Sequence, residues 1–379
     1  MTRALPLEGL TVVSLEQAVA APFATRQLAD LGARVIKIER DVGDFARAYD
    51  TTVGGLSSYF VWLNRNKESV ILDLKSEAGV EALRRLVLKA DVLVQNLVPS
   101  AIERLGFGGD KALALNPRLI HASISGYGRG GPYEQKKAYD LLVQCEAGFL
   151  SVTGTPEAPV KSGISIADIA AGMYCYSGIL AALLQRSKTG CGDVIEISML
   201  EALGEWMSQP YFYAEYGGQQ QPRSGAEHAT IAPYGPFATT DGSVFFGIQN
   251  EREWKSFCEI VLRNPEVAMD PRFSGNAVRV ANRAALHLTI NEALTRVTTT
   301  ELLERLDHAG IANARLRDMS GFSHHPQIAA RNRWRDVLSP AGPIRTLIPP
   351  VTSRETGFRM DAVPSLGEHT AAVLLELGM

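Results

Sequence analysis

One carboxylate stands alone in a long apolar stretch of the sequence. Asp168 is the only Asp, Glu, Lys, Arg or His between Lys161 and Arg186. Residues 162–190 have a helical pattern that is apolar on nearly all sides, which is typical of a buried helix. A carboxylate at the start of such a helix can act as a nucleophile or a proton acceptor, or it can interact with free backbone N–H groups. Its scarcity favours the chemical role.

A second polar pair, Tyr139 and Asp140, precedes the apolar helical pattern of residues 140–148. Asp is a preferred residue at helix N-termini, because its carboxylate accepts hydrogen bonds from the first backbone N–H groups. We therefore expect Asp140 to cap its own helix and Tyr139 to pack at the surface.

Polar and basic residues recur just past the ends of the predicted strands. They are Arg40, Lys75, Asn96, Arg104 and Lys137. Each of them alone has the sequence context of a solvated surface group. In open α/β sheets, however, ligands bind outside the carboxyl ends of the strands. The five positions together therefore indicate a ligand site at that edge of the sheet.

Glycine motifs for nucleotide binding are missing from the expected places. Residues 126–132 follow a strand, but Pro132 closes the segment and no helical pattern begins there, so it does not fit G-x-G-x-x-G. The first strand-to-helix turn has no glycine, and no P-loop sequence occurs. These observations disfavour a dehydrogenase or an NTPase. Ala18, Ala20 and Ala21 still let a ligand approach the backbone near a helix N-terminus, where anions are favoured.

Metal and disulfide chemistry are also disfavoured. The only adjacent histidines, His324 and His325, have no partner at a metal-ligand spacing, so we expect no metal site. The chain has four widely spaced cysteines without a C-x-x-C pair, Cys145, Cys175, Cys191 and Cys258. We expect these to be reduced thiols of a cytoplasmic protein.

Composition and charge are those of an ordinary globular protein. The chain has 379 residues, 46% hydrophobic and 21% charged, which is enough for two or three domains. Lys plus Arg total 38 and Asp plus Glu total 41, so the formal net charge is −3, and a nucleic-acid surface is not expected. We expect neither a signal peptide nor an apolar run of membrane length.

The first two hundred residues alternate short β-branched runs with helical patterns, which predicts an α/β fold with an open parallel sheet covered by helices. The predicted strands are residues 10–15, 34–39, 69–74, 91–96, 119–125 and 193–198. Between them, apolar residues return every three or four positions, as in residues 20–31 and 80–87.

The pattern changes beyond residue 215. Residues 216–232 are rich in Gly, Gln and polar residues and predict a linker or active-site loop, and residues 240–242 predict a hairpin turn. Helical patterns follow at 253–262 and 299–308, which indicates a smaller α+β domain. We therefore divide the chain into a large domain (1–215), a linker or active-site loop (216–225), a small α+β domain (226–317) and a segment that returns to the large domain (318–379).

Five motifs occur in a specific order along nearly the whole chain. They are A-P-F-x-x-x-x-L-A-D-L-G-A-x-V-I-K-I-E-R at 21–40, N-R-N-K-x-S-V-x-L-D-L-K at 64–75, S-G-Y-G-x-x-G-P at 125–132, Y-D-L-x-x-Q-x-x-x-G at 139–148 and A-P-Y-G-P-F-x-T-x-D-G at 232–242. With this set the chain resembles the family III CoA-transferases, which include acyl-CoA racemases. The resemblance implies a CoA-binding, Rossmann-like large domain built from both chain ends, a smaller domain and an interlocked homodimer.

The resemblance also implies roles for individual residues. Asp168 matches the catalytic carboxylate of the family. The positions that match coenzyme A contacts are Val19, Ala20, Arg40, Leu72, Lys75, Asn96, Leu97, Arg104 and Lys137. Coenzyme A enters as part of the substrate, and no permanently bound cofactor is implied. Scattered cations suit its diphosphate and 3′-phosphate, since the net charge of the chain is negative.

The implied chemistry is the exchange of a thioester between acids. Asp168, with a reference pKa of ~3.9, attacks the thioester carbonyl to give an aspartyl mixed anhydride and CoA thiolate, which then form an aspartyl-CoA thioester. The chain departs from the formyl-CoA transferase pattern in two places. Val19 replaces a glutamine, with Gln17 two residues earlier. The consecutive glycines that formyl-CoA transferase has before its small domain are replaced by G-G-Q-Q-Q-P-R-S-G-A-E-H at 217–228, in which we expect Gly225 to be the loop glycine. The formyl-CoA and oxalate pair is therefore not implied.

For the substrates, we expect succinyl-CoA or another dicarboxylic acyl-CoA as donor and a small carboxylic acid as acceptor. A dicarboxylate needs a cation near its free end. The residues expected to line the substrate pocket are Gln17, Arg47, Tyr139, Arg223, Gly225 and His228. The alternatives are that Arg47 binds a CoA phosphate or braces a loop, and that His228 is a loop histidine with internal partners.

Two other functions stay open. An acyl-CoA racemase of the same fold needs acid and base groups on both faces of the substrate carbon. The racemase pattern has a histidine where this chain has Tyr139, whose reference pKa of ~10 makes it a poor base at neutral pH. The third function is a non-catalytic acyl-CoA-binding protein, in which Asp168 would serve only the helix end.

Overall fold

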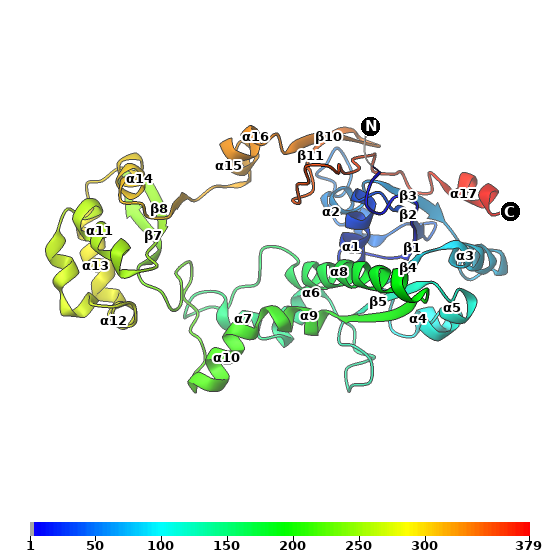
Figure 1. Cartoon of the computed structure of the whole chain (residues 1–379), viewed down its shortest axis with the longest axis horizontal. Helices are drawn as coiled ribbons and strands as arrows, with labels where there is room; N and C mark the ends of the chain where they lie inside the picture. Colours follow the sequence, from blue (N-terminus) through cyan, green and yellow to red (C-terminus); the bar gives the residue numbers. More distant parts are fainter. Residues whose placement is uncertain (1–3) are drawn as a thin grey trace. The chain divides into compact units, whose positions relative to one another are not determined.

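The computed structural model describes residues 4–379 and divides the chain into two compact units (Figure 1). The sheet unit comprises Met1–Phe149, Ser162–Gln209 and Ala329–Met379, and the small unit comprises Leu150–Lys161 and Pro210–Ile328. The sheet unit contains hydrophobic cores on both faces of its sheet, and the small unit has a core of its own. The four-part division expected from the sequence, with boundaries at 215, 225 and 317, stays a prediction.

Six parallel strands form the centre of the sheet unit, in the order β3-β2-β1-β4-β5-β6. Their bounds are Thr11–Leu15 (β1), Arg34–Glu39 (β2), Lys67–Ile71 (β3), Val92–Gln95 (β4), Ile120–Ser125 (β5) and Asp193–Ser198 (β6). Val12 on β1 pairs with Val35 on β2 and with Val92 on β4. Strands buried on both faces have near-continuous apolar runs, as residues 92–94 of β4 do. The sheet confirms the predicted α/β class.

The third strand starts earlier than the hydropathy pattern predicts. The predicted range is 69–74, whereas β3 spans Lys67–Ile71. Asn66, with a φ of 66°, turns the chain into the strand. Lys67 is buried and pairs with an acid, so a charged residue occupies a strand position that an apolar pattern does not include.

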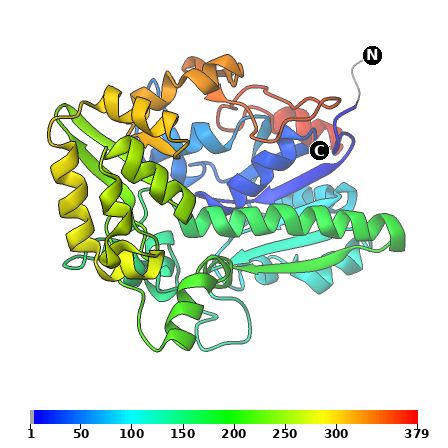
Figure 2. The same cartoon turned by 60° about the vertical axis from the view of Figure 1, so that its left-hand side comes forward.

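Helices cover both faces of the sheet, because alternate strand residues point to opposite sides. On one face, α1 (Ala20–Asp30), α8 (Ile166–Thr189) and α9 (Met199–Trp206) pack against strand residues such as Val12. On the other, α3 (Glu77–Lys89), α5 (Gly109–Leu115) and α17 (Thr370–Glu376) pack against residues such as Val13. Figure 2 shows α8, the long green helix, running beside β6.

Helix α8 is long and apolar enough to cross a membrane, judged by length and composition alone. An 18-residue window has a mean hydropathy of 1.5, so the expectation that no apolar run reaches membrane length is wrong. The run passes because residues 169–185 contain no charged side chain. Ala170, Cys175 and Ile179 are nevertheless buried within the core of the sheet unit, as in the core helix of a globular protein.

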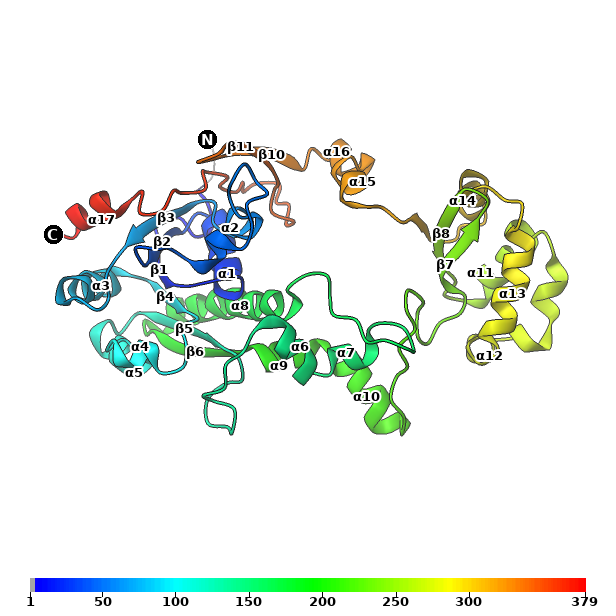
Figure 3. The same ribbon diagram turned by 180° about the vertical axis from the view of Figure 1, so that it is seen from behind.

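The chain end returns to the outer edge of the sheet. The strands β10 (Trp334–Ser339) and β11 (Gly342–Leu347) form an antiparallel pair. Further on, the Gly367 N–H donates to Ser69 Oγ and the His369 N–H donates to the Ser69 carbonyl oxygen. These bonds cover the edge of β3 beside α17 (Figure 3). The remaining short elements of this unit are η1 (Phe45–Ala48), α2 (Ser58–Leu63), α4 (Ala101–Arg104) and α6 (Asp140–Glu146).

The small unit is built on a three-stranded antiparallel sheet, β7 (Tyr234–Thr239), β8 (Gly242–Gly247) and β9 (Asn313–Arg315). The predicted hairpin turn at 240–242 is confirmed, because Thr239 pairs with Gly242. Stacked aromatic rings, including Phe237, Phe246 and Trp254, fill its core. Its other helices are α11 (Glu251–Ser256), η2 (Phe257–Val261), η3 (Pro265–Met269), η4 (Pro271–Phe273), α12 (Asn276–Ala281), α13 (Arg283–Leu294), α14 (Thr299–His308) and α15 (Met319–Ser323), while α7 (Phe149–Val152), α10 (Ser208–Gly217) and α16 (Pro326–Ala330) cross the unit boundaries.

Candidate active site

Asp168 lies in the first turn of α8, but it does not cap that helix. The Asp140 carboxylate does so instead, because its Oδ1 accepts the N–H of Ala167 at 2.8 Å and that of Asp168 at 3.3 Å. The expectation that Asp140 caps its own helix is therefore wrong. Asp140 is the first residue of α6, which follows Tyr139, and its side chain satisfies the end of another helix. The Asp168 carboxylate is thus spared the capping role.

Gln144 strengthens the same link between α6 and the start of α8. Its Nε2 donates to Asp140 Oδ2 at 2.6 Å, and its Oε1 accepts the N–H of Ser162 at 2.9 Å. Gln144 is fully buried, so these bonds are shielded from water. Asp140 and Gln144, one turn apart on α6, therefore fix residues 162–168, the segment that carries Asp168.

The Asp168 carboxylate has no cationic partner among residues 4–379. Neither an ion pair nor a hydrogen bond reaches its oxygens within the part of the chain that the structure describes. Burial, together with the charge of Asp140, raises the pKa of Asp168 to about 7. Such a carboxylate is ionised in part at neutral pH and is more basic than an ordinary one, so it can attack an electrophilic carbon or take up a proton.

One tyrosine, Tyr49, lies within electrostatic reach of Asp168. Burial, followed by the charges of Asp44 and Asp168, raises the pKa of Tyr49 to about 12, and Tyr139 contributes as well. Tyr139 itself is 65% exposed. Tyr139 was predicted from the sequence as a pocket residue, whereas Tyr49, which stands two residues after Arg47, was not predicted. Only the aromatic residues at 45, 49 and 59 would have signalled it, and these form a ring cluster.

The first turn, residues 17–20, lies where the strand order reverses between β1 and β4, a common ligand position in open α/β sheets. Asn96 clamps the backbone of Gln17, since its Oδ1 accepts the Gln17 N–H and its Nδ2 donates to the Gln17 carbonyl, each at 2.8 Å. Val19 is the N-cap of α1, and no side chain caps that end. The turn therefore offers backbone rather than side chains to a ligand.

The other positions matched to coenzyme A contacts follow the carboxyl ends of successive strands. Arg40 follows β2, Leu72 and Lys75 follow β3, and Leu97 and Arg104 follow β4, while Lys137 lies between β5 and α6. Arg40, Lys75, Arg104 and Lys137 are exposed and form no ion pair with any described residue. Cations that no carboxylate neutralises are available to phosphates.

Arg47 is engaged inside the sheet unit. Its guanidinium donates to Glu39 from Nη2 at 2.7 Å and from Nε at 3.1 Å, and it lies 3.6 Å above the Phe60 ring. This placement matches the alternative in which Arg47 braces a loop.

The remaining predicted pocket residues belong to the small unit. Arg223 donates to the carbonyl oxygens of Thr155 and Pro156, both at 2.8 Å. Gly225 has a φ of 63°, which favours glycine, and its N–H donates to the Gly154 carbonyl. The His228 ring stacks on Tyr234 with ring centroids 5.2 Å apart. All three residues therefore take part in shaping one loop.

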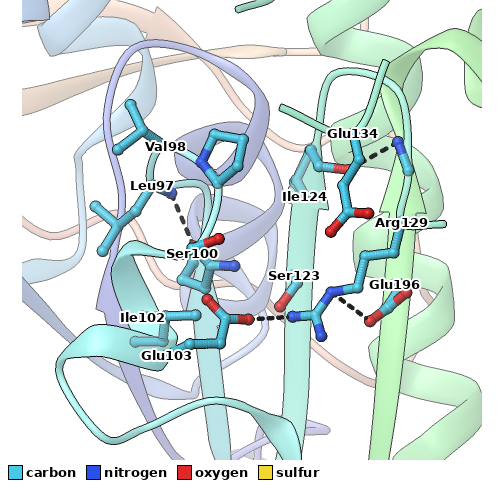
Figure 4. Close-up of a pocket in the computed structure, with 14 residues that line it drawn as sticks. Leu97, Val98, Ser100, Ile102, Glu103, Ser123, Ile124, Arg129, Glu134 and Glu196 are labelled. Carbon is cyan, nitrogen blue, oxygen red and sulfur yellow. Dashed lines mark hydrogen bonds and ion pairs between the residues drawn. The ribbon is translucent and has the colours of Figure 1, made fainter. Parts of the chain in front are cut away.

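A pocket of about 160 Å³ opens beside the segment that carries Leu97 (Figure 4). Arg129 spans it and pairs with Glu103 at 2.5 Å and with Glu196 at 2.9 Å. Glu134 adds a third carboxylate to the lining. This acidic surplus disfavours phosphate, so the pocket is not where a diphosphate would bind. In the described part of the chain, no group of three His, Cys, Asp or Glu residues could hold a metal ion.

Comparison with known proteins identifies relatives along the whole chain. Residues 7–370 match the model of a family described as CoA-transferase family III. The chain is 35% identical to acetyl-CoA:oxalate CoA-transferase of Acetobacter aceti, over 98% of this chain and 95% of that protein. It is 33% identical to succinyl-CoA:glutarate CoA-transferase of Homo sapiens, over 100% and 87%. A solved CAIB/BAIF family protein from Brucella suis has a TM-score of 0.87 and 33% identity, over 99% of this chain and 100% of that one.

Proposed function

This chain belongs to CoA-transferase family III, and we propose that it transfers coenzyme A from a dicarboxylic acyl-CoA such as succinyl-CoA to a small carboxylic acid, with Asp168 as the nucleophile. The observation that carries the proposal is the Asp168 carboxylate, which is released from capping by Asp140 and has no cation beside it among residues 4–379. In this proposal, the reactive group of the enzyme is one side chain, the carboxylate of Asp168.

The proposed reaction has four balanced steps. The Asp168 carboxylate attacks the thioester carbon of the donor, the C–S bond breaks, and CoA leaves as thiolate from a mixed anhydride. The thiolate attacks the aspartyl carbonyl of this anhydride. The donor acid leaves as a carboxylate, and Asp168 is now bound to CoA as a thioester. The acceptor carboxylate attacks that thioester, which releases the thiolate again and forms a second mixed anhydride, between Asp168 and the acceptor acid. The thiolate then attacks the acceptor carbonyl and returns Asp168 as a carboxylate. No ATP, metal or permanently bound cofactor takes part.

We propose that the strand-end residues bind coenzyme A. Arg40, Lys75, Arg104 and Lys137 supply charge for the phosphates, because no described carboxylate neutralises them. Val19 and Ala20 supply backbone at the first turn, and Leu72, Asn96 and Leu97 line the strand ends between these cations.

A dicarboxylic acceptor is supported by the names of the relatives, since oxalate, succinate and glutarate are all dicarboxylic acids. Its free carboxylate needs a cation, and Arg47 and Arg223 are the arginines proposed for it. Gln17, Tyr139, Gly225 and His228 are the other proposed substrate contacts. Both guanidinium groups already have internal acceptors, so binding the substrate would require them to share a donor or to move.

An acceptor screen tests the substrate proposal. Wild type is supplied with succinyl-CoA and a panel of mono- and dicarboxylates, in parallel with Arg47→Ala and Arg223→Ala. We expect dicarboxylates to react best and at least one substitution to weaken that preference. Best turnover with a monocarboxylate such as acetate, with the preference unchanged in both variants, would overturn the dicarboxylate proposal and leave the transferase intact.

Racemisation is separated from transfer by an experiment without any acceptor acid. Incubation of an α-branched acyl-CoA in deuterated water is expected to leave the α-hydrogen unexchanged, because Tyr139 replaces the second base. Exchange of that hydrogen would favour the racemase. Binding of CoA without exchange across the whole acid panel would favour the non-catalytic protein.

We also propose a cytoplasmic homodimer. Large apolar side chains are exposed on the helices, notably Leu184 on α8 and Tyr211, Phe212 and Tyr216 on α10. Exposed apolar patches of this kind mark interaction surfaces. All four cysteines are free thiols, which suits a reducing compartment. Sedimentation at micromolar concentration is expected to give twice the mass of one chain, and a monomer would contradict the proposal.

A further inference from the structure

The turn between β1 and α1 contains a residue in a strained conformation. Ala18 has a φ of 61°, which places it in the left-handed region that residues with a Cβ rarely adopt. Such a residue keeps its conformation only where its surroundings hold it. Val19 and Ala20, which follow it, are two of the positions proposed to contact coenzyme A.

Side chains from the two neighbouring strands hold this turn through its backbone. Asn96 follows β4 and binds both the N–H and the carbonyl of Gln17. Asp44 follows β2, and its Oδ1 accepts the N–H of Ala18 at 3.1 Å and that of Ala46 at 2.9 Å. The strained residue is thus tied directly to the Asp44 carboxylate.

Asp44 is itself fixed by a buried charge cluster, which we define as Glu16, Lys37, Asp44 and Lys67. Lys37 Nζ lies 2.8 Å from Asp44 Oδ2 and 3.4 Å from Glu16 Oε1, and Lys67 Nζ lies 2.6 Å from the same Glu16 oxygen. The side chains in these pairs are 0% exposed. Two carboxylates balance two ammonium groups, so the loss of one member would leave a charge buried without a partner.

We propose that Asp44, backed by Lys37, is a positioning residue for the acyl-CoA substrate, because it holds Ala18 in the left-handed conformation that places Val19 and Ala20 for binding. The inference rests on the proposed function only in taking an acyl-CoA as the ligand of this turn. Asp44 touches no reacting atom. Its loss should therefore weaken substrate and transition state alike, which raises KM and leaves kcat nearly unchanged.

Three variants separate positioning from general stability. Asp44→Ala is expected to raise KM for the acyl-CoA by about tenfold or more, with kcat within about threefold of wild type. Asp44→Asn keeps an oxygen acceptor for Ala18 and should recover most of the loss. Asp50→Ala is the matched control, because the Asp50 carboxylate accepts the N–H groups of Thr52 and Ser58 in the same manner but does not touch the turn. KM and kcat of this control should match wild type.

Substitutions of Ala18 test the role of the strained conformation directly. Ala18→Val can also be measured if Asp44→Ala fails to fold. Ala18→Val, with Asp44 intact, should raise KM as Asp44→Ala does, since β-branched residues tolerate positive φ poorly. Ala18→Gly placed in Asp44→Ala should lower KM back toward wild type, because glycine adopts this conformation without a partner. A merely structural role of Asp44 predicts no such rescue.

The outcomes are distinct. An Asp44→Ala variant that melts earlier but keeps the wild-type KM, or that loses kcat at constant KM, would overturn the proposal, as would the absence of glycine rescue. Calorimetric Kd values for CoA itself, measured on the same variants, do not depend on turnover. If wild type exchanges CoA with no acid, the proposed function fails, yet a raised Kd in Asp44→Ala would still support the positioning role.

Discussion

Two carboxylate-rich regions of the sheet unit differ in whether a cation pairs with the carboxylates. In the buried charge cluster, Lys37 and Lys67 pair with Glu16 and Asp44. At the start of α8, the only charged neighbour of Asp168 within the described residues is another carboxylate, Asp140. The fold therefore pairs charges where a turn must be rigid and leaves one unpaired where a group must react.

The pKa values of Glu16 and Asp168 shift in opposite directions because only Glu16 has lysines beside it. Burial alone would raise the pKa of Glu16, but Lys67 and Lys37 together bring it below its ordinary value. Burial and Asp140 act in the same direction on Asp168 and raise its pKa to about 7. Burial raises the pKa of both carboxylates, and the lysines beside Glu16 reverse that shift, whereas Asp140 adds to it at Asp168.

The largest expected effect comes from deleting the unpaired carboxylate. Asp168→Ala should lower the rate of CoA transfer at least ~10⁴-fold, because it removes the nucleophile and not only a contact. Steady-state assays with succinyl-CoA and the best acceptor measure this. Turnover within tenfold of wild type would place the chemistry elsewhere.

The second largest effect is a loss of stability, expected when a lysine is removed from the buried charge cluster. Lys37→Met should cost about 3–5 kcal/mol of unfolding free energy, because it leaves Glu16 and Asp44 buried with one lysine between them. Urea titration measures the change. Arg84→Met, which removes an exposed partner of Glu81, is the control and should leave the midpoint nearly unchanged. Equal midpoints for the two variants would contradict the view that Lys37 neutralises buried carboxylates.

A smaller, opposite effect is expected when Asp168 is neutralised. Its folded-state pKa lies above the ordinary 3.8, so the folded chain binds the proton more tightly than the unfolded chain does. Ionisation therefore costs stability as the pH rises from about 4 to about 7. Asp168→Asn should be more stable than wild type at pH 8, and this difference in unfolding free energy should shrink as the pH falls and vanish near pH 4. A variant less stable than wild type at pH 8 would contradict the unpaired state.

The smallest effect concerns the pH profile. The kcat/KM for the acyl-CoA should rise with pH through an apparent pKa of about 7, because the ionised form of Asp168 attacks. Asp140→Asn removes the neighbouring charge and should move this midpoint to lower pH. A midpoint that stays in place in the variant would show that Asp140 acts only through its hydrogen bonds to the start of α8.

The sequence was most informative where structure depends on local pattern. The runs at 34–39 and 193–198 are rich in Val and Ile and begin at a charged residue, Arg34 or Asp193, and both strands have these bounds in the structure. Asp168 could be singled out because no other charge occurs nearby in a long apolar helix. Both signals need only a short window of residues.

The interactions that shape the site were not predictable in this way. Asp140 caps a helix that starts 26 residues later in the chain, and Lys67 reaches Glu16 across 51 residues. Nothing in a local pattern distinguishes a buried, paired lysine from a solvated one. The one available signal was the placement of Lys37 between Ile36 and Ile38 in a strand that is buried on both faces.

The most direct test of the central claim, that the unpaired Asp168 carboxylate forms the covalent intermediate, is trapping with hydroxylamine. Wild type is mixed with succinyl-CoA and then with neutral hydroxylamine, and peptides are analysed by mass spectrometry. We predict a hydroxamate on Asp168, formed only after exposure to acyl-CoA and absent from Asp44 and Asp140. An unmodified Asp168 in enzyme that still turns over, or modification of another carboxylate instead, would contradict the account.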